Sequence, residues 1–93
     1  MEITEVRVSP IEGDEKLKGF ATVIFDNEFV VRDLKIISGQ KGLFVAMPSR
    51  KMKDGSFKDV AHPLNNEMRR KLEEAVLKEY DKARAAKSEE ENQ

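Results

Sequence analysis

The amino-acid sequence predicts an α+β fold, in which a mostly antiparallel sheet of four or five strands is followed by one long amphipathic helix. Two observations lead to this prediction. Apolar and polar residues alternate with a period of two in the first part of the chain, as in half-buried strands, and from Asn65 the apolar period changes to 3.6. A length of 93 residues accommodates one domain. We therefore expect a single domain over residues 1–86 and an acidic, disordered tail at 87–93.

Five segments are expected to form strands, because β-branched and aromatic residues are concentrated in them and turn-forming residues separate them. Gly13 and Asp14 indicate a first turn, and the polar run 26–28 indicates a tight hairpin connection. A polar loop is expected at 49–56. The expected strands are residues 3–8, 18–26, 29–37, 43–47 and 57–61.

A long helix is expected from Asn65 or Asn66, either of which can cap the first turn with its side-chain oxygen. Glu67 would lie near the positive end of the helix dipole. Apolar residues at helical spacing then form one stripe, which favours packing of this helix on the sheet. The stripe consists of Met68, Leu72, Ala75, Val76, Tyr80 and Ala83. The tail after residue 86 has no apolar residue, which is why we expect it to be disordered.

The predicted second, third and fourth strands carry apolar side chains on both faces. One amphipathic helix covers only one face of a sheet, so the second face needs another cover. A second copy of the chain is the simplest cover, and we therefore expect a homodimer. The alternative is a strongly coiled sheet that buries both faces against itself.

The net charge of −1 conceals a segregation of charge along the chain. Residues 41–71 contain eight bases and three acids, a net charge of +5, whereas the segments before and after them each carry −3. One electropositive site between acidic flanks favours an anionic partner such as a nucleic acid. The candidate nucleic-acid-binding residues are the cations of the predicted loop, the last short strand and the helix start: Arg50, Lys51, Lys53, Lys58, Arg69, Arg70 and Lys71.

These seven cations would border one surface if the fold brought the loop and the helix start together. Such a surface could neutralise phosphates and release counterions. Phe57 is the only aromatic residue nearby, and it alternates like a core residue, so neither a stacking platform nor base-specific reading is expected. The alternative is an ordinary solvated loop.

The sequence offers few candidates for catalysis or metal binding. The absence of Cys excludes disulfides, thiolate metal sites and cysteine catalysis. His62 with Asp59 could form a hydrolase constellation if Ser49 or Ser56 supplied the nucleophile, and these same two residues are the only local metal ligands. At the junction before the helix, the imidazole is more simply interpreted as satisfying backbone groups. We therefore expect no enzyme activity, metal, cofactor or small-molecule substrate.

Signals for targeting and for nucleotide binding are also missing. The N-terminus is acidic and has no signal region, and no apolar run approaches the ~20 residues that span a bilayer. Gly39 and Gly42 indicate a turn and not a phosphate loop, because a strand follows them. We expect a soluble, cytoplasmic protein without membrane insertion.

Residues 30–65 contain a series of specific motifs: Asp33-Leu34, GLFVAMPS at 42–49, DG at 54–55 and DVAHPLN at 59–65. In these motifs the chain closely resembles the bacterial SpoVG family of stage V sporulation and septation proteins. The resemblance implies a homodimeric, cytoplasmic protein that affects formation of the division septum and, in spore formers, sporulation. It also implies a DNA- and RNA-binding regulator, with contacts at Arg50, Lys51, Lys53, Arg69 and Arg70.

The leading hypothesis is therefore a non-enzymatic, homodimeric regulator of septation that binds DNA or RNA through the basic loop and the helix start. The alternative is a protein-interaction module of the division or sporulation machinery that makes no direct contact with nucleic acid. In the alternative, the exposed side of the helix or the sheet edge would form the interface.

Overall fold

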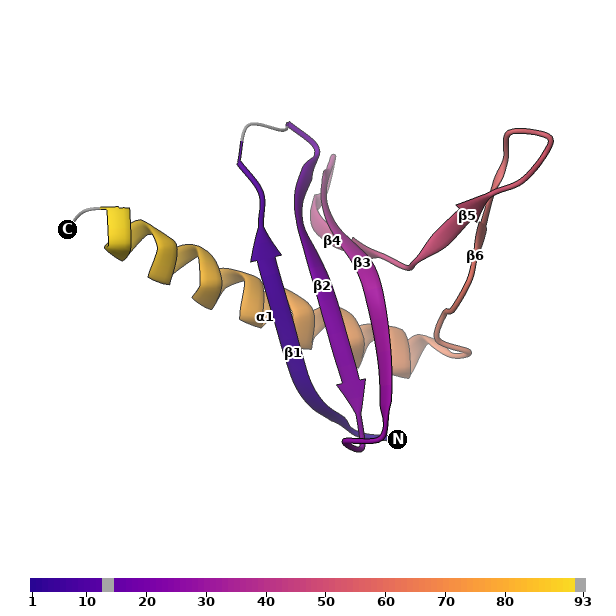
Figure 1. Cartoon of the computed structure of the whole chain (residues 1–93), viewed down its shortest axis with the longest axis horizontal. Coiled ribbons are helices and arrows are strands. Elements are labelled where there is room, and N and C mark those ends of the chain that lie inside the picture. Colours follow the sequence, from indigo (N-terminus) through magenta and orange to yellow (C-terminus); the bar gives the residue numbers. More distant parts are fainter. Residues whose placement is uncertain (13–14, 92–93) are drawn as a thin grey trace.

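The computed structural model describes residues 1–12 and 15–91, and it has the α+β architecture that the sequence predicts (Figure 1). A four-stranded antiparallel sheet, a separate two-stranded sheet and a C-terminal helix form the fold. The turn predicted at Gly13 and Asp14 lies outside the described residues. The elements are β1 (Ile3–Pro10), β2 (Leu17–Phe25), β3 (Phe29–Gly39), β4 (Gly42–Ala46), β5 (Ser49–Lys51), β6 (Phe57–Asp59) and α1 (Asn66–Glu91).

The four strands of the larger sheet lie in sequence order, so each strand pairs with the next one along the chain. β2 and β3 are connected by a tight turn in which Asp26 and Asn27 have left-handed backbone angles, with φ of 51° and 53°. Across this turn the amide of Glu28 donates to the carbonyl of Phe25 at 2.9 Å. Left-handed residues at both central positions match the right-handed twist of paired strands. The predicted hairpin is confirmed.

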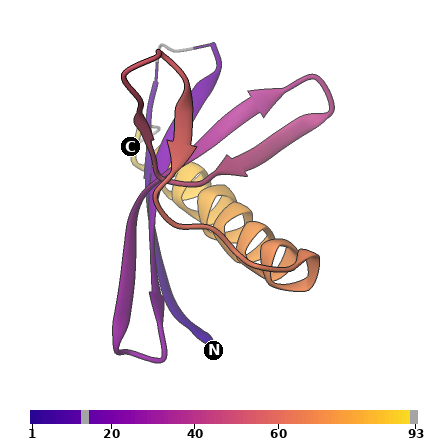
Figure 2. The ribbon, with the colours of Figure 1, turned by 90° about the vertical axis from the view of Figure 1, so that its right-hand side faces the viewer.

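A bulge interrupts β3 near its middle. Between two regular pairs of β2 and β3, Arg32 and Asp33 both lie opposite the single residue Thr22. Asp33 has a φ of 63°, a left-handed conformation that Asp adopts more readily than most residues. Bulges increase the local twist, and Figure 2 shows the two halves of β3 running in different directions. The bend turns the β3–β4 hairpin away from the β2–β3 turn.

α1 covers one face of the larger sheet, where it packs mainly against β1 and also reaches β4 (Figure 1). Alternate side chains of β2, and those of Leu34, Ile36 and Val45 in β3 and β4, are buried on one face of the sheet, and this burial is the main stabilising contribution to the fold. The helical residues of this core belong to the predicted apolar stripe, so the amphipathic interpretation of the helix is confirmed. The buried core consists of Ala21, Val23, Phe25, Leu34, Ile36, Val45, Met47, Leu72, Val76 and Tyr80.

The opposite face of the larger sheet, which we call the outer face, carries Phe20, Ile24, Ile37 and Phe44. Phe20 and Phe44 are 39% and 42% exposed, and the two isoleucines are half-buried. Ile37 and Phe44 lie directly opposite each other on β3 and β4. The sheet does not bury both faces against itself, so the strongly coiled alternative is wrong.

Asn65 caps the helix, since its Oδ1 accepts a hydrogen bond from the amide of Met68 at 2.7 Å. The helix continues to Glu91, whereas the sequence led us to expect disorder from Lys87. The reason is that Ala, Lys and Glu after residue 84 are all good helix formers and nothing breaks the helix there. Residues 92 and 93 of the expected tail lie outside the described residues. No helix in the described part of the chain is both long and apolar enough to cross a membrane.

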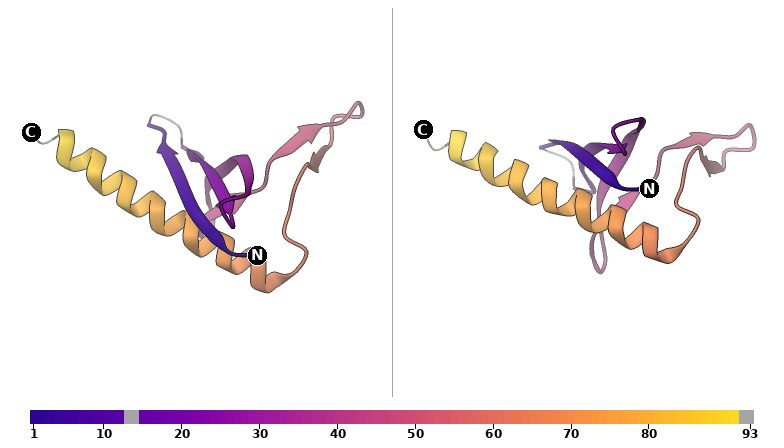
Figure 3. Two further views of the ribbon diagram at one scale, coloured as in Figure 1. Left: turned by 60° about the horizontal axis from the view of Figure 1, so that its bottom comes forward. Right: turned by 90° about the horizontal axis from the view of Figure 1, so that it is seen from below.

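β5 and β6 form a two-stranded arm, residues 49–59, which projects from the rest of the molecule (Figures 1 and 3). The prediction of a loop at 49–56 is wrong in its first three residues, which pair with β6, and the fifth strand is shorter than predicted. A ribbon that is exposed on both faces needs no apolar alternation, so periodicity did not reveal the pairing. The radius of gyration is 14.1 Å, compared with about 12 Å for a compact chain of this length.

Candidate nucleic-acid interface

Backbone hydrogen bonds hold the arm in register from its base to its tip. At the base, the amide of Val60 donates to the carbonyl of Pro48 at 2.7 Å. At the tip, the Met52 amide donates to the Ser56 carbonyl at 2.7 Å, and the Gly55 amide donates to the Met52 carbonyl at 3.0 Å. Gly55 has a φ of 91°, a conformation that glycine adopts without a steric penalty. The arm therefore presents its side chains in fixed cross-strand positions.

The carboxylate of Asp54 at the tip accepts hydrogen bonds within the turn. Its Oδ1 accepts hydrogen bonds from the Ser56 hydroxyl at 2.6 Å and from the Ser56 amide at 2.9 Å. These bonds, the hydroxyl bond first, lower the pKa of Asp54 because they stabilise the carboxylate form. The acid at the tip thus stabilises the turn, and within the described part of the chain it forms no ion pair with the neighbouring bases.

One face of the arm concentrates positive charge. Arg50 and Lys58 lie directly opposite each other in the register of β5 and β6, so the two cations share this face. Residues 49–59 contain four bases and two acids, a net charge of +2. Among the side chains that the structure describes, none of the arm's bases forms an ion pair with a carboxylate. These bases are Arg50, Lys51, Lys53 and Lys58.

The cations of the helix start have a different environment. Arg69 and Arg70 are exposed and border a shallow hollow on the helix surface together with acids such as Glu73. Lys71 lies on another side of the helix, where its Nζ is 3.7 Å from Oε1 of Glu67 and where it borders the N-terminus of the chain. Positive charge at the helix start is therefore interspersed with carboxylates.

The structure divides the seven predicted site residues into two groups. Arg50, Lys51, Lys53 and Lys58 belong to the arm, and Arg69, Arg70 and Lys71 belong to the helix start. Both groups lie at the same end of the molecule in Figures 1 and 3, but the arm points away from the helix. The two groups of cations therefore lie near the same end of the molecule, but the structure does not bring the loop and the helix start into contact.

Phe57 is the residue of the arm that sequence reasoning misplaced. We expected it in the core, but it is 70% exposed and lies on β6 directly opposite Lys51. Alternation indicates a core residue only where one face of a strand is buried, and neither face of the arm is. The sequence did contain one sign that Phe57 is exposed. Residues 49–59 contain no other aromatic residue, and Met52 is their only other large apolar residue, so the large apolar residues are too few to form a core.

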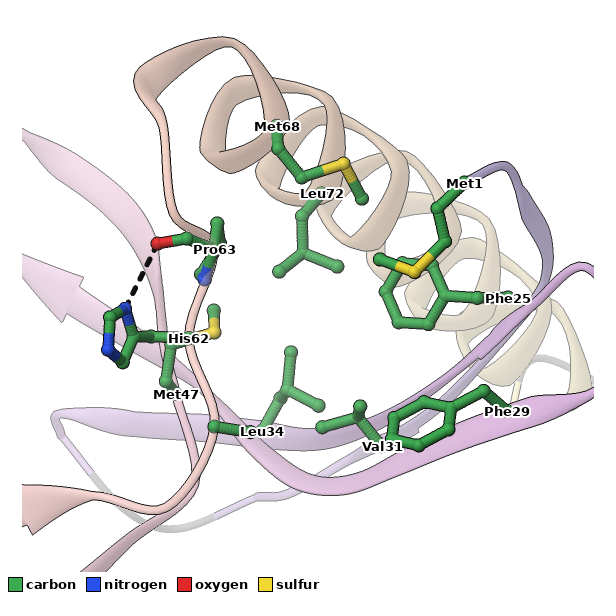
Figure 4. A pocket seen from close by; sticks show the side chains of 11 residues that line it. Met1, Phe25, Phe29, Val31, Leu34, Met47, His62, Pro63, Met68 and Leu72 are labelled. Atoms are coloured by element: carbon green, nitrogen blue, oxygen red, sulfur yellow. Dashed lines mark hydrogen bonds between the residues drawn. The ribbon is translucent and has the colours of Figure 1, made fainter.

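His62 lies in the connection between the arm and the helix (Figure 4). Its Nδ1 is 3.0 Å from the carbonyl oxygen of Pro63, which accepts a hydrogen bond from the ring, so the predicted interaction with backbone groups is confirmed. The ring lies at the rim of an apolar hollow and points away from it, whereas Leu34 and Leu72 line the hollow from opposite sides. No three His, Asp or Glu side chains of the described residues gather as they would around a metal ion.

The chain matches the SpoVG family over residues 1–82. It is similar to a protein named "Putative septation protein SpoVG" from Thermoanaerobacter sp. (strain X514), with 58% identity over 84 residues, 90% of this chain and 91% of the relative. The protein of the same name from Clostridium beijerinckii is 58% identical over 83 residues, 89% of this chain and 91% of the relative. That from Clostridium acetobutylicum is 55% identical over 84 residues, 90% and 88% of the two chains.

Proposed function

The chain belongs to the SpoVG family, and we propose that it is a non-enzymatic regulator of septation, and of sporulation in spore formers, that binds DNA or RNA through the arm. The family membership confirms the resemblance indicated by the motifs between residues 30 and 65. The septation role follows from the name of the relatives. Binding of nucleic acid is supported by the charge and geometry of the arm.

The single observation that carries the proposal is the cross-strand pair of Arg50 and Lys58. Like charges directly opposite each other destabilise a pair of strands, and here no described carboxylate compensates for them. A phosphate group held between the two side chains would replace this repulsion by two charge-assisted hydrogen bonds. Binding of a phosphate from another molecule would therefore stabilise the arm.

Arg69 and Arg70 would extend this contact surface along the helix start. Both are exposed and lie at the end of the molecule from which the arm projects (Figure 1). Lys71 is paired with Glu67, but exposed ion pairs are worth only about 0–1 kcal/mol, so a phosphate can compete for this lysine. We expect the helix cations to contribute less to the affinity than those of the arm.

We also propose that the protein acts as a homodimer. The outer face exposes two phenylalanine side chains, and burial of such a surface against a second copy is favourable by roughly 25 cal/mol per Å² of apolar area. A dimer would present two arms to one nucleic acid. Linked binding sites raise the overall affinity without any new contact.

A titration of DNA and RNA fragments in gel-shift experiments tests the proposal. We expect the double variant Arg50→Ala with Lys51→Ala to weaken binding and to flatten its salt dependence, because each phosphate contact contributes about 0.9 to the slope of log K against log salt. Lys41→Ala with Lys78→Ala is the matched control, since it removes the same charge from exposed positions outside the arm. Binding that is insensitive to the double substitution in the arm, or to a threefold increase in salt, would refute the proposal.

The second candidate function is a protein-interaction module of the division machinery. The observation in its favour is that β1 and β4 are edge strands of the larger sheet, and edge strands are common sites of protein association. In this case capture of a division protein would depend on residues of these edge strands or of the exposed helix face, such as Lys78. It would also survive neutralisation of the arm's cations, which separates the two functions.

A further inference from the structure

We propose that the arm prefers single-stranded nucleic acid to duplex, with the ring of Phe57 stacking on an unpaired base. The inference rests on the proposed function, because it assumes that the arm contacts nucleic acid, and it assigns a ligand class to the same site. It is carried by the exposure of Phe57 and by the cations around it.

The ring of Phe57 is largely exposed to solvent. It is 70% exposed, and it lies on a strand whose three residues are all exposed. Lys51, directly opposite on β5, does not cover the ring with its ammonium group. Exposing a phenyl ring forfeits the favourable free energy of its burial, so a partner that covers the ring would recover it.

Cations adjoin Phe57 in the register of the arm. Lys51 is the cross-strand neighbour of Phe57, and Lys58 follows it in the chain and projects with Arg50 from the other face of the ribbon. In a single strand each base lies between two phosphates. A base stacked on Phe57 would therefore place a flanking phosphate near Lys51, on the same face, and the continuing strand could reach the Arg50–Lys58 pair only by passing around the edge of the ribbon.

Duplex nucleic acid would not use the ring in this way. The bases of a duplex are already stacked on one another, so their faces are closed to a side chain unless the helix is distorted. A two-stranded ribbon can enter the major groove, but there a phenyl ring reaches only the base edges, such as the methyl group of thymine, and not the face of a base. Stacking on unpaired bases tolerates any sequence, because every base has a π-face.

The experiment measures fluorescence anisotropy with three labelled probes of about 12 nucleotides, within the site sizes known for single-strand binders. The probes are a single-stranded DNA, its duplex, and a single strand of abasic sugars with the same number of phosphates. The variants are Phe57→Leu, which keeps an apolar side chain but removes the π-face, and Phe57→Tyr, which keeps the ring. Circular dichroism and sedimentation of each variant report on the fold and on the oligomeric state.

We expect wild type to bind the single strand more tightly than the abasic strand or the duplex. Phe57→Leu should weaken binding of the single strand about tenfold, should leave binding of the abasic strand unchanged, and should be rescued in Phe57→Tyr. Equal effects of Phe57→Leu on all three probes, or none, would overturn the stacking inference and leave salt-sensitive binding by the arm intact. A change of oligomeric state in Phe57→Leu would also overturn it, because the ring would then contact a second copy. Absence of binding to all three probes and to a single-stranded RNA of the same sequence would refute the proposed function itself.

Discussion

The cross-strand pair of Arg50 and Lys58 allows one substitution to separate stability from function. Lys58→Glu places a carboxylate opposite Arg50 in the same register, so a repulsive pair becomes an attractive one. The arm should become more stable and at the same time lose its affinity for nucleic acid. Substitutions that damage the fold lower both quantities, so an opposite change of the two is diagnostic.

The expected magnitudes follow from the exposure of the arm. Cross-strand charge pairs contribute about 0.2–1 kcal/mol, and for an exposed pair we expect about 0.5–1 kcal/mol of local stabilisation. The loss of a charge-assisted hydrogen bond to a phosphate costs about 1.5–3 kcal/mol, which weakens binding roughly ten- to one-hundred-fold. The slope of log K against log salt should fall by about 0.9 for the lost contact on duplex DNA and by about 0.7 on a single strand.

Two measurements check these values. The amides of Met52 and Val60 donate hydrogen bonds across the arm, so their hydrogen exchange reports its local opening. Exchange of both amides should slow by a factor of about 2–5 in Lys58→Glu, as a stabilisation of about 0.5–1 kcal/mol requires. Gel-shift titrations at several salt concentrations measure the binding.

Lys41→Glu is the control, because it makes the same change of charge at an exposed position in the β3–β4 turn. It should leave exchange in the arm unchanged and reduce binding only slightly. Faster exchange in Lys58→Glu would contradict the repulsion argument. Equal losses of affinity in both variants would show that net charge, and not the pair, determines binding.

Three further predictions concern the scaffold and the tip of the arm. Leu34→Ala removes a fully buried side chain of the core and should lower the free energy of unfolding by about 2–5 kcal/mol in urea titrations. Asn65→Ala removes the helix cap and should cost about 1 kcal/mol by the same measurement, whereas Asn65→Ser should retain most of the stability. Ser56→Ala should raise the pKa of Asp54 toward its ordinary value in an NMR titration of the carboxyl group. Because the pKa of Asp54 is lower in the folded than in the unfolded protein, ionised Asp54 stabilises the fold at pH values above the unfolded pKa. This stabilisation is lost as the pH falls through the folded pKa. The loss of stability at low pH should therefore be smaller in Ser56→Ala than in wild type.

The larger sheet and the helix could be predicted because their signals are local. The turn at Asp26 and Asn27, the cap at Asn65 and the stripe that includes Val76 each occupy a short window of sequence. Each signal also agrees with the element that the structure contains. Burial of one face gives both strands and helix a period that the sequence displays.

The arm could be predicted only in part, because no buried face imposes a period on it. β5 consists of three polar residues, and its pairing with β6 depends on the turn at Asp54 and Gly55. The cations were recognisable as residue types. Which of them share a face depends on the pairing register, and this is why the opposition of Arg50 and Lys58 was not foreseen.

The direction of the arm depends on features that are still less visible in a sequence. The bulge at Asp33 bends β3 and so contributes to the path by which the chain reaches β5. Asp33-Leu34 stood out as a motif, but its left-handed conformation could not be deduced from residue types alone. The separation of the arm from the cations near Arg69 is a consequence of this three-dimensional path.

Because no side chain of residues 49–59 belongs to the buried core, the fold and the proposed ligand surface are specified by different parts of the sequence. Substitutions in the arm carry little penalty in folding, so natural variation can accumulate there without loss of the scaffold. If the arm binds nucleic acid as proposed, exchange of a few arm residues would change the preference for a ligand without changing the scaffold. The same independence makes the arm a practical position at which to graft a new recognition sequence onto an unchanged domain.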